Sequence, residues 1–367
     1  MTDLSKELQQ QVLTARDEKR ALSIIGGGSK SFMGRETSGS RLDLSGHTGI
    51  VNYHPVELVM TARAGTPITE IEAALAENNQ MLAFEPPRFS DAATIGGTLA
   101  CNQSGPSRPW SGSVRDHVLG VRLINGLGEH LKFGGQVMKN VAGYDVSRLQ
   151  AGAMGSLGVI TEVSLKVLPK PAATKTLVWD MDAQAAITFM NQLSARPKPV
   201  SAACWLEGRL YVRLSGALSA VEATVQEWQG KEWQGKGAFG SGSLDSDVFD
   251  SEKFWEQLRH QKLDFFNQAL PLWRLSVNST AQIASLDSES LIDWGGAQRW
   301  YRGEADKTRM ESLATEAGGQ VSLFAGGDRC SEVMHNAPVV LQTIQKRIKD
   351  SFDPDGIFNP GRLYSWM

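Results

Sequence analysis

Apolar residues along this chain recur at helical spacing in some segments and at every second position in others. Residues 1–20 place leucine, valine and alanine one helical turn apart among charged and polar residues, which predicts an amphipathic helix. Residues 159–167 alternate apolar and polar side chains, the pattern of a strand with one buried face. Similar patterns predict strands at residues 21–25 and 58–62 and helices at residues 67–78 and from residue 336 onwards.

Two features interrupt this pattern in the second half of the chain. Pro169-Lys170-Pro171 stops both helix and strand, so we expect a domain boundary there, with domains at residues 1–170 and 171–334. The pentapeptide EWQGK occurs twice in succession at residues 227–236, which we interpret as a local duplication in a surface loop. The last segment, residues 335–367, begins with a predicted helix whose apolar stripe comprises Val340, Leu341, Ile344 and Ile348.

Composition narrows the class of protein. The chain has 367 residues, a formal charge of -3, 41% hydrophobic and 21% charged residues, which is ordinary for a globular protein and gives no reason to expect nucleic acid as a partner. It contains no stretch of about 18 apolar residues, so no transmembrane span is expected. Cys101, Cys204 and Cys330 are odd in number and far apart, which favours a reducing compartment and predicts no metal site.

Glycines concentrate in the first half of the chain, where residues 94–158 hold 13 of the 37. Three consecutive glycines at residues 26–28 follow a predicted strand but match neither a Walker A motif nor the GxGxxG fingerprint. Consecutive backbone N–H groups there can form an anion-binding nest, to which Lys30 adds positive charge. The adjacent glycines of TIGGTLA at residues 94–100 let the backbone approach a bulky ligand closely. Backbone groups of GAMGSLGVI at residues 152–160 can hydrogen-bond a purine, which has both donors and acceptors.

These segments, taken together, resemble a known family. GGGSK, PPRFSDAATIGGTLACNQSGPSR, GSVRDHVLG, KNVAGYDV and GSLGVITEVSLKVLP resemble the FAD-binding domain of the vanillyl-alcohol oxidase (PCMH-type) flavoproteins, and FDPDGIFNPGRL is similar to that family's C-terminal return to the flavin. The motifs span about half of the chain. The resemblance implies an α+β fold: a PCMH-type FAD-binding domain of two α/β subdomains, a smaller α+β cap domain, and a C-terminal segment that returns to the FAD domain.

The resemblance also implies a role for each matching residue. The first glycine loop matches a pyrophosphate loop that comprises Gly26, Gly27, Gly28, Ser29 and Lys30. A second loop, which touches the pyrophosphate and the isoalloxazine ring, comprises Thr94, Gly96, Gly97, Asn102, Ser104 and Gly105. An adenosine-side clamp comprises Gly155, Gly158 and Ile160, and Asn359 falls where the C-terminal tail meets the flavin. Some family members attach FAD through a histidine after the first glycines; here that position is Ser29, so FAD is expected to bind non-covalently.

Catalytic residues are less well marked. Larger catalytic relatives carry a motif close to GHxGDGNxH, whereas residues 323–329 read LFAGGDR without a histidine, which puts independent catalysis in doubt. The six histidines of the chain show no acid-base or metal-ligand spacing, so they are interpreted as structural. Three arginines beside aromatic residues are candidate binders of a substrate carboxylate, although a structural role is favoured for them: Arg274, Arg299 and Arg302.

Within the family, the likeness is to FAD-binding subunits of glycolate oxidases. It implies a multi-subunit dehydrogenase that oxidises glycolate, a small 2-hydroxy acid, to glyoxylate. A larger catalytic flavoprotein subunit and an iron–sulfur subunit would be the partners, because no cysteine cluster in this chain suits an iron–sulfur centre. The implied location is cytoplasmic, peripheral at the inner membrane through the complex. Two alternatives stay open: a self-sufficient FAD-dependent 2-hydroxy acid dehydrogenase, and a non-catalytic scaffold subunit.

Overall fold

The computed structural model describes residues 2–135, 144–228, 243–244, 250–283 and 289–367. The chain packs into two compact units. Unit 1 comprises Met1–Ser104, Gly112–Pro169 and Asp328–Met367; unit 2 comprises Gly105–Ser111 and Lys170–Gly327. The sequence pattern put domain boundaries after residues 170 and 334 and gave no indication that Gly105–Ser111 packs with unit 2. Residues 139–143 of the KNVAGYDV motif and residues 229–236 of the EWQGK repeat lie outside the described residues.

A five-stranded antiparallel sheet runs through unit 1. Its order is β3 (Ile50–His54), β4 (Val59–Arg63), β8 (Val159–Lys166), β6 (Val118–Ile124) and β7 (His130–Gly134). The predicted strand at residues 159–167 is thus the central strand of this sheet, and its alternating apolar residues are buried. Two smaller sheets complete the unit: the parallel pair β1 (Leu22–Ile25) with β2 (Ser40–Asp43), and β5 (Gln80–Met81) with β9 (Leu168–Pro169).

Helices of unit 1 cover its sheets with the faces that the sequence predicted, with one exception. Helix α1 (Ser5–Asp17) buries Leu8, Val12 and Ala15, and α2 (Ile68–Ala76) buries Ile68, Ile71 and Leu75 in the same hydrophobic core. Each such leucine or isoleucine contributes about 1.5–3 kcal/mol to stability. The remaining helices are α3 (Ile95–Cys101), α5 (Val114–His117), α6 (Val146–Leu149) and α11 (Val339–Phe352).

Helix α11 is the exception. It forms where predicted, but three of its four stripe residues, Val340, Leu341 and Ile344, are exposed. The residue of this helix that is most buried is Lys349, which pairs with Asp353. The spacing therefore predicted the helix correctly, and the structure shows that most of its apolar stripe is exposed.

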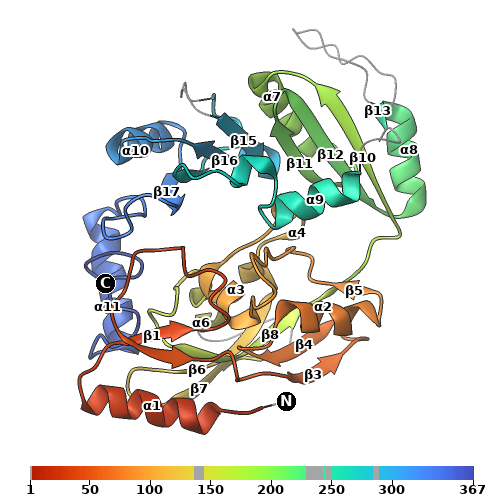
Figure 1. Cartoon of the computed structure of the whole chain (residues 1–367). Coiled ribbons are helices and arrows are strands. Elements are labelled where there is room, and N and C mark those ends of the chain that lie inside the picture. Colours follow the sequence, from red (N-terminus) through yellow and green to blue (C-terminus); the bar gives the residue numbers. More distant parts are fainter. Residues whose placement is uncertain (1, 136–143, 229–242, 245–249, 284–288) are drawn as a thin grey trace. The chain divides into compact units, whose positions relative to one another are not determined.

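Unit 2 is built on an eight-stranded antiparallel sheet (Figure 1). Its order is β13 (Ser243–Leu244), β10 (Ala173–Asp180), β12 (Arg209–Gly216), β11 (Val200–Leu206), β15 (Glu289–Asp293), β16 (Gln298–Arg302), β14 (Leu272–Ser276) and β17 (Gln320–Ala325). Its helices are α4 (Arg108–Ser111), α7 (Ala183–Ser194), α8 (Leu218–Trp228), α9 (Ser251–Arg259), α10 (Lys307–Glu316) and the short η1 (Asp264–Phe266) and η2 (Trp294–Gly296). Helices α7 and α8 pack on β11 and β10 around a second hydrophobic core.

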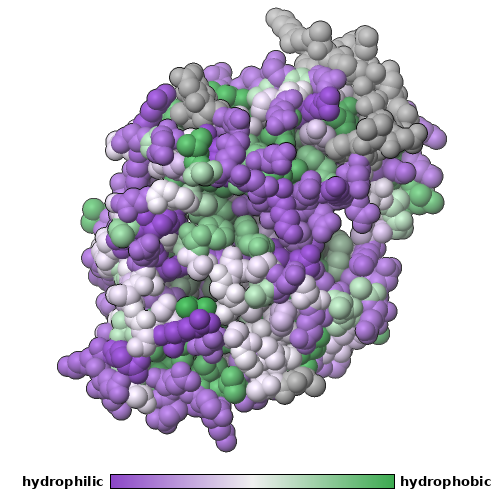
Figure 2. Space-filling view, in the orientation of Figure 1, coloured by the Kyte–Doolittle hydropathy of each residue, from purple (hydrophilic) through white to green (hydrophobic). Residues whose placement is uncertain are grey.

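The predicted α+β class is confirmed by these two mixed units. On the face of the molecule in view, hydrophilic side chains predominate and apolar ones form small groups (Figure 2). Across the described ranges, none of the helices combines the length and the apolar character that a membrane crossing requires.

Candidate functional site

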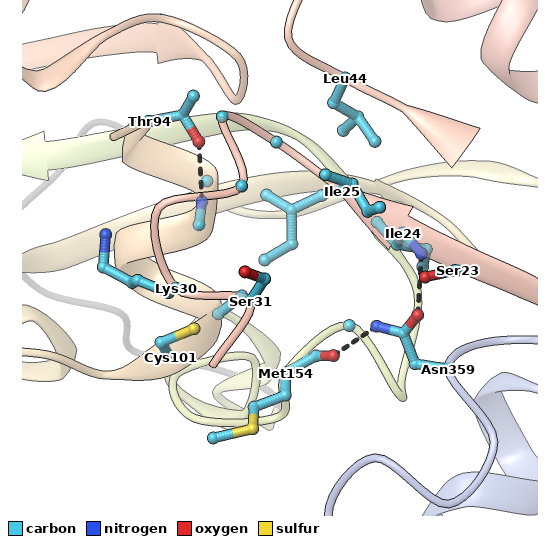
Figure 3. A pocket seen from close by; sticks show the side chains of 18 of the residues that line it. Ser23, Ile24, Ile25, Lys30, Ser31, Leu44, Thr94, Cys101, Met154 and Asn359 are labelled. Carbon is cyan, nitrogen blue, oxygen red and sulfur yellow. Dashed lines mark hydrogen bonds between the residues drawn. The ribbon is translucent and has the colours of Figure 1, made fainter. Parts of the chain in front are cut away.

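Unit 1 contains a cavity of about 370 Å³, a size typical of ligand pockets (Figure 3). Four segments that are distant in the sequence form most of its wall. They are β1 with the loop that follows it, α3 with the residue before it, the turn that leads into β8, and the chain that follows α11. A strand end, a helix start and a returning tail thus meet at one place.

Twelve of the fifteen cofactor-binding residues predicted from the sequence line this cavity. They are Gly26, Gly27, Gly28, Ser29, Lys30, Thr94, Gly96, Gly97, Gly155, Gly158, Ile160 and Asn359. The other three, Asn102, Ser104 and Gly105, are not among the lining residues, and each has a different place. Asn102 ends α3 in the left-handed conformation, and Ser104 accepts a hydrogen bond from the Val114 amide at 3.2 Å. The Gly105 carbonyl accepts the Trp294 indole N–H at 3.0 Å, within unit 2.

The glycines of the first loop serve two different purposes. A Cβ atom on Gly27 would lie 1.5 Å from the Ala92 carbonyl oxygen, so this glycine is required because one backbone segment packs on another. Gly28 instead has a φ of +70°, and a Cβ there would meet nothing within 4 Å. Only the second position leaves backbone open to a ligand. Both glycines line the cavity, and the absence of a side chain is required by the contact with Ala92 at Gly27 and by the positive φ at Gly28.

Two cations in the wall make the cavity suitable for an anion. Lys30 is 7% exposed; its Nζ lies 3.4 Å from the Ser29 hydroxyl and 5.7 Å from the centre of the Phe89 ring. Arg362 donates to the carbonyl oxygens of Ser31 and Arg35. Burial lowers the pKa of both side chains, and neither forms an ion pair with a carboxylate in the described chain. Charges that are removed from water are normally paired, so we expect an anionic ligand to bind beside these two cations.

Asn359 joins three parts of the wall (Figure 3). Its Oδ1 accepts the Ile24 amide at 2.8 Å, and its Nδ2 donates to the Met154 carbonyl at 2.6 Å. Next to it, Phe358 forms a parallel bridge with Leu22 of β1. The C-terminal segment therefore positions the first glycine loop and the turn before β8 relative to each other.

Arg362 and Cys101 are among the wall residues that sequence reasoning missed. Arg362 follows Asn359 by three positions in the FNPGRL motif, so its place in that motif was the available signal. Cys101 is at the end of α3, where burial raises the pKa of its thiol and keeps it protonated. A protonated thiol is a poor nucleophile.

The three candidate arginines have different surroundings in unit 2. Arg302 donates to the carbonyl oxygens of Phe265, Phe266, Gln268 and Leu270. Arg299 donates to those of Gly296, Ala281 and Gln282. The guanidinium N–H groups of both arginines therefore bind loop carbonyl groups and fix these loops to the sheet. These contacts support a structural role for the two residues.

Arg274 differs from them. Its Nε is buried without a hydrogen-bond partner, and its guanidinium lies over the Phe324 ring at 5.5 Å. Burial, followed by the nearby charge of Arg108, lowers its pKa to about 10. Arg108 itself lies 4.4 Å from the centre of the Trp294 ring. Two guanidinium groups close together, one of them with an unsatisfied donor, form a site suited to a carboxylate.

Other titratable groups have structural partners. His47 and His130 both contact Thr161, at 3.0 Å to its carbonyl and 2.8 Å to its hydroxyl, in agreement with the structural reading of the histidines. Asp328, in the segment that replaces the histidine motif, accepts hydrogen bonds from the Ser331 hydroxyl and the Cys330 amide. The first of these holds the pKa of Asp328 below its usual value. In the part of the chain that the structure describes, no three acidic, histidine or cysteine side chains are grouped to hold a metal.

The fold of unit 1 and its anion-suited cavity define a PCMH-type FAD-binding flavoprotein. A family model described as an FAD binding domain matches residues 4–134. Two solved structures have the same fold. A 4-ethylphenol oxidase from Gulosibacter chungangensis has a TM-score of 0.71 at 14% identity, covering 99% of this chain and 88% of that one. An alkyldihydroxyacetonephosphate synthase has a TM-score of 0.65 at 15% identity, covering 97% and 74%.

Sequence relatives narrow the assignment further. The chain is 45% identical over 363 residues to glycolate oxidase subunit GlcE of Escherichia coli (strain K12), which covers 99% of this chain and 98% of that protein. It is 33% identical over 146 residues to glycolate oxidase subunit GlcD of Bacillus subtilis (strain 168), covering 39% of this chain and 31% of that protein. The chain belongs to the GlcE family. Its cofactor is FAD, and its role is that of an oxidoreductase subunit.

Proposed function

We propose that this chain is the FAD-binding subunit of a multi-subunit dehydrogenase that oxidises glycolate to glyoxylate and passes electrons to an iron–sulfur subunit. A larger flavoprotein subunit would be the second partner. The complex would work on the cytoplasmic side of the inner membrane, and this chain would be held there only through its partner subunits. The observation that carries the proposal is a pair of cations beside the glycine loops, the buried Lys30 and the half-buried Arg362, neither of which has a carboxylate partner in the described chain. Similarity to the GlcE subunit over 99% of the chain supports the choice of reaction.

In this proposal five residues of the cavity wall have defined tasks. Lys30 and Arg362 hold the pyrophosphate, and Gly28 lets it approach the backbone. FAD, when bound, supplies the electron-accepting chemistry. Ser29 occupies the position of the attachment histidine, and the Cys101 thiol is held protonated, which supports non-covalent binding. Three predicted residues lie outside this wall, and we propose that they contact other parts of FAD: Asn102, Ser104 and Gly105.

For the substrate, we propose that Arg274, assisted by Arg108, binds the glycolate carboxylate. The unsatisfied Nε of Arg274 and the absence of a carboxylate among the charges that act on its pKa support this choice over Arg299 and Arg302. We assign the base that takes the hydroxyl proton to the larger partner subunit, because the segment AGGD lacks the histidines of the catalytic motif and Asp328 is engaged in a local turn.

Replacing Lys30 with methionine is expected to weaken FAD binding about 10- to 100-fold, since a hydrogen bond to a charged group is worth about 1.5–3 kcal/mol. Fluorescence titration of the apoprotein with FAD measures this change. Burial lowers the pKa of free Lys30, and a bound pyrophosphate raises it again, so binding takes up a proton. Wild-type affinity should therefore fall as the pH rises through the pKa of free Lys30, and the variant should lose this dependence. Lys6→Met, at an exposed position of α1, is the control; equal affinities for the two variants would contradict the assignment.

Arg274→Met is expected to raise the KM for glycolate of the reconstituted complex about 10- to 100-fold, because the substrate carboxylate loses a charged hydrogen-bond donor. Steady-state reduction of an artificial dye measures this, with FAD content unchanged. Arg213→Met is the matched control, since Arg213 also lies over an aromatic ring of unit 2, 5.1 Å from the centre of the Trp255 ring. An unchanged KM would refute the role of Arg274.

The same assay separates the alternative functions. Glycolate turnover by the isolated chain would favour a self-sufficient dehydrogenase. A colourless protein that takes up no FAD would favour a scaffold and contradict both flavoprotein functions.

A further inference from the structure

Helix α11 leaves its aliphatic side chains in solvent. Val339, Val340, Leu341 and Ile344 are 77%, 70%, 45% and 47% exposed. The helix is attached to unit 1 through a polar residue instead, because Lys349 is buried and donates to the carbonyl oxygens of Ser156 and Phe358. The aliphatic stripe is therefore not needed to hold the helix in place.

Exposed aliphatic residues are common when they occur singly, but here they cluster. Helix α11 carries four large hydrophobic side chains within six consecutive positions, and all four are exposed in the described part of unit 1. Clusters of this kind on a protein surface mark interaction sites. In Figure 1 the helix lies at one side of unit 1.

A cation completes the pattern. Val340, Ile344 and Arg347 follow one another at i, i+4 and i+7, so they project from the same side of the helix. Arg347 is exposed and forms no ion pair with any residue that the structure describes, whereas its neighbour Lys346 lies 5.5 Å from the centre of the Trp366 ring. Aliphatic anchors at this spacing, ended by a charge, are typical of a helix that binds in a groove of another protein.

We propose that α11 is the docking helix for a different polypeptide, the larger flavoprotein subunit, which offers an apolar groove with a carboxylate opposite Arg347. This inference rests on the proposed function, in which the chain works inside a complex. A second copy of this chain fits the surface less well, because the exposed charges of α11 are Lys346, Arg347 and Asp350, a net positive set that would face itself. A lipid surface also fits less well, because the stripe carries neither tryptophan nor phenylalanine.

Two variants test the proposal: the double variant Val340→Asp/Ile344→Asp, and Arg347→Glu. Each is co-expressed with the larger flavoprotein subunit and purified through this chain, and the ratio of the two polypeptides is measured. Both variants should reduce the recovered partner at least tenfold while FAD per chain and far-ultraviolet circular dichroism stay at wild-type values. Arg347→Glu guards against misfolding of the double variant, because it changes a single exposed side chain. Val56→Asp, at a position that is 96% exposed elsewhere in unit 1, is the control and should leave the ratio unchanged.

Other results would overturn the proposal. Wild-type ratios for both variants would exclude α11 as the docking helix. Light scattering that shows a wild-type dimer dissociated by the variants would identify a second copy as the occupant. Loss of binding to phosphatidylglycerol vesicles, with the partner ratio unchanged, would identify a lipid surface. If the wild-type chain retains FAD but never co-purifies with the larger subunit, the proposed function itself fails.

Discussion

Lys349→Met is expected to lower the free energy of unfolding of unit 1 by about 3–5 kcal/mol, the cost of leaving one partner of a buried ion pair alone. The Lys349 Nζ lies 2.5 Å from Asp353 Oδ2, and it donates to the carbonyl oxygens of Ser156 at 2.8 Å and Phe358 at 2.9 Å. Asp353 also accepts the amides of Ile357 and Phe358. The substitution would leave a carboxylate and two carbonyl groups without their cation.

The same change is expected to release FAD. Ser156 and Phe358 are the chain neighbours of Gly155 and Asn359, which both line the cavity. Urea denaturation followed by circular dichroism measures the stability, and flavin absorbance after desalting measures the retained cofactor. Lys346→Met is the control on the same helix, because Lys346 is exposed and should cost under about 1 kcal/mol. Equal stability of the two variants would show that the buried pair does not hold the C-terminal segment in place.

Gly27→Ala is expected to abolish FAD binding and to destabilise unit 1 by about 3 kcal/mol or more, since overpacking against backbone cannot be relieved by a rotamer change. The added Cβ would lie 1.5 Å from the Ala92 carbonyl oxygen and 3.1 Å from the Ala92 Cβ. The first glycine loop and the segment before α3 would have to move apart, and both contribute to the cavity wall.

The neighbouring glycine provides the matched control. Gly28→Ala adds the same methyl group where nothing lies within 4 Å, so it should cost only about 1–2 kcal/mol for the left-handed φ of +70°. Thermal unfolding of both variants measures the difference in stability, and FAD titration compares Gly27→Ala with the wild type. A Gly27→Ala protein as stable as Gly28→Ala would mean that the contact with Ala92 is not required.

Features that depend on local pattern were predicted well from the sequence. The alternation at residues 159–167 identified the strand β8, and the glycine-rich segments identified most of the cavity wall. Both predictions succeeded because a few consecutive residues determine the local backbone conformation. The exposure of the α11 stripe could not be predicted, because helical spacing defines a stripe but not the direction in which it faces. That direction is set by the pair Lys349 and Asp353, which the pattern of apolar residues does not reveal.

Features that depend on distant segments could not be predicted. Arg274 and Arg302 both lie beside aromatic residues in the sequence, yet only Arg302 meets four carbonyl groups, contributed by residues 265–270 about 30 positions earlier. Arg362 likewise reaches the cavity only because the chain after α11 returns to β1. Which arginine keeps a free donor is decided by tertiary packing, and sequence neighbours alone do not report it.

The bond between Asn359 and Ile24 has a consequence for how the protein is made. Ribosomes deliver the chain from its N-terminus, so the first glycine loop emerges more than 300 residues before the asparagine that fixes it. Until then the loop lacks both Asn359 and the cation Arg362. FAD therefore binds only after the C-terminal segment has been synthesised. Until then the N-terminal half of the nascent chain must avoid aggregation although the wall of its cofactor cavity is incomplete.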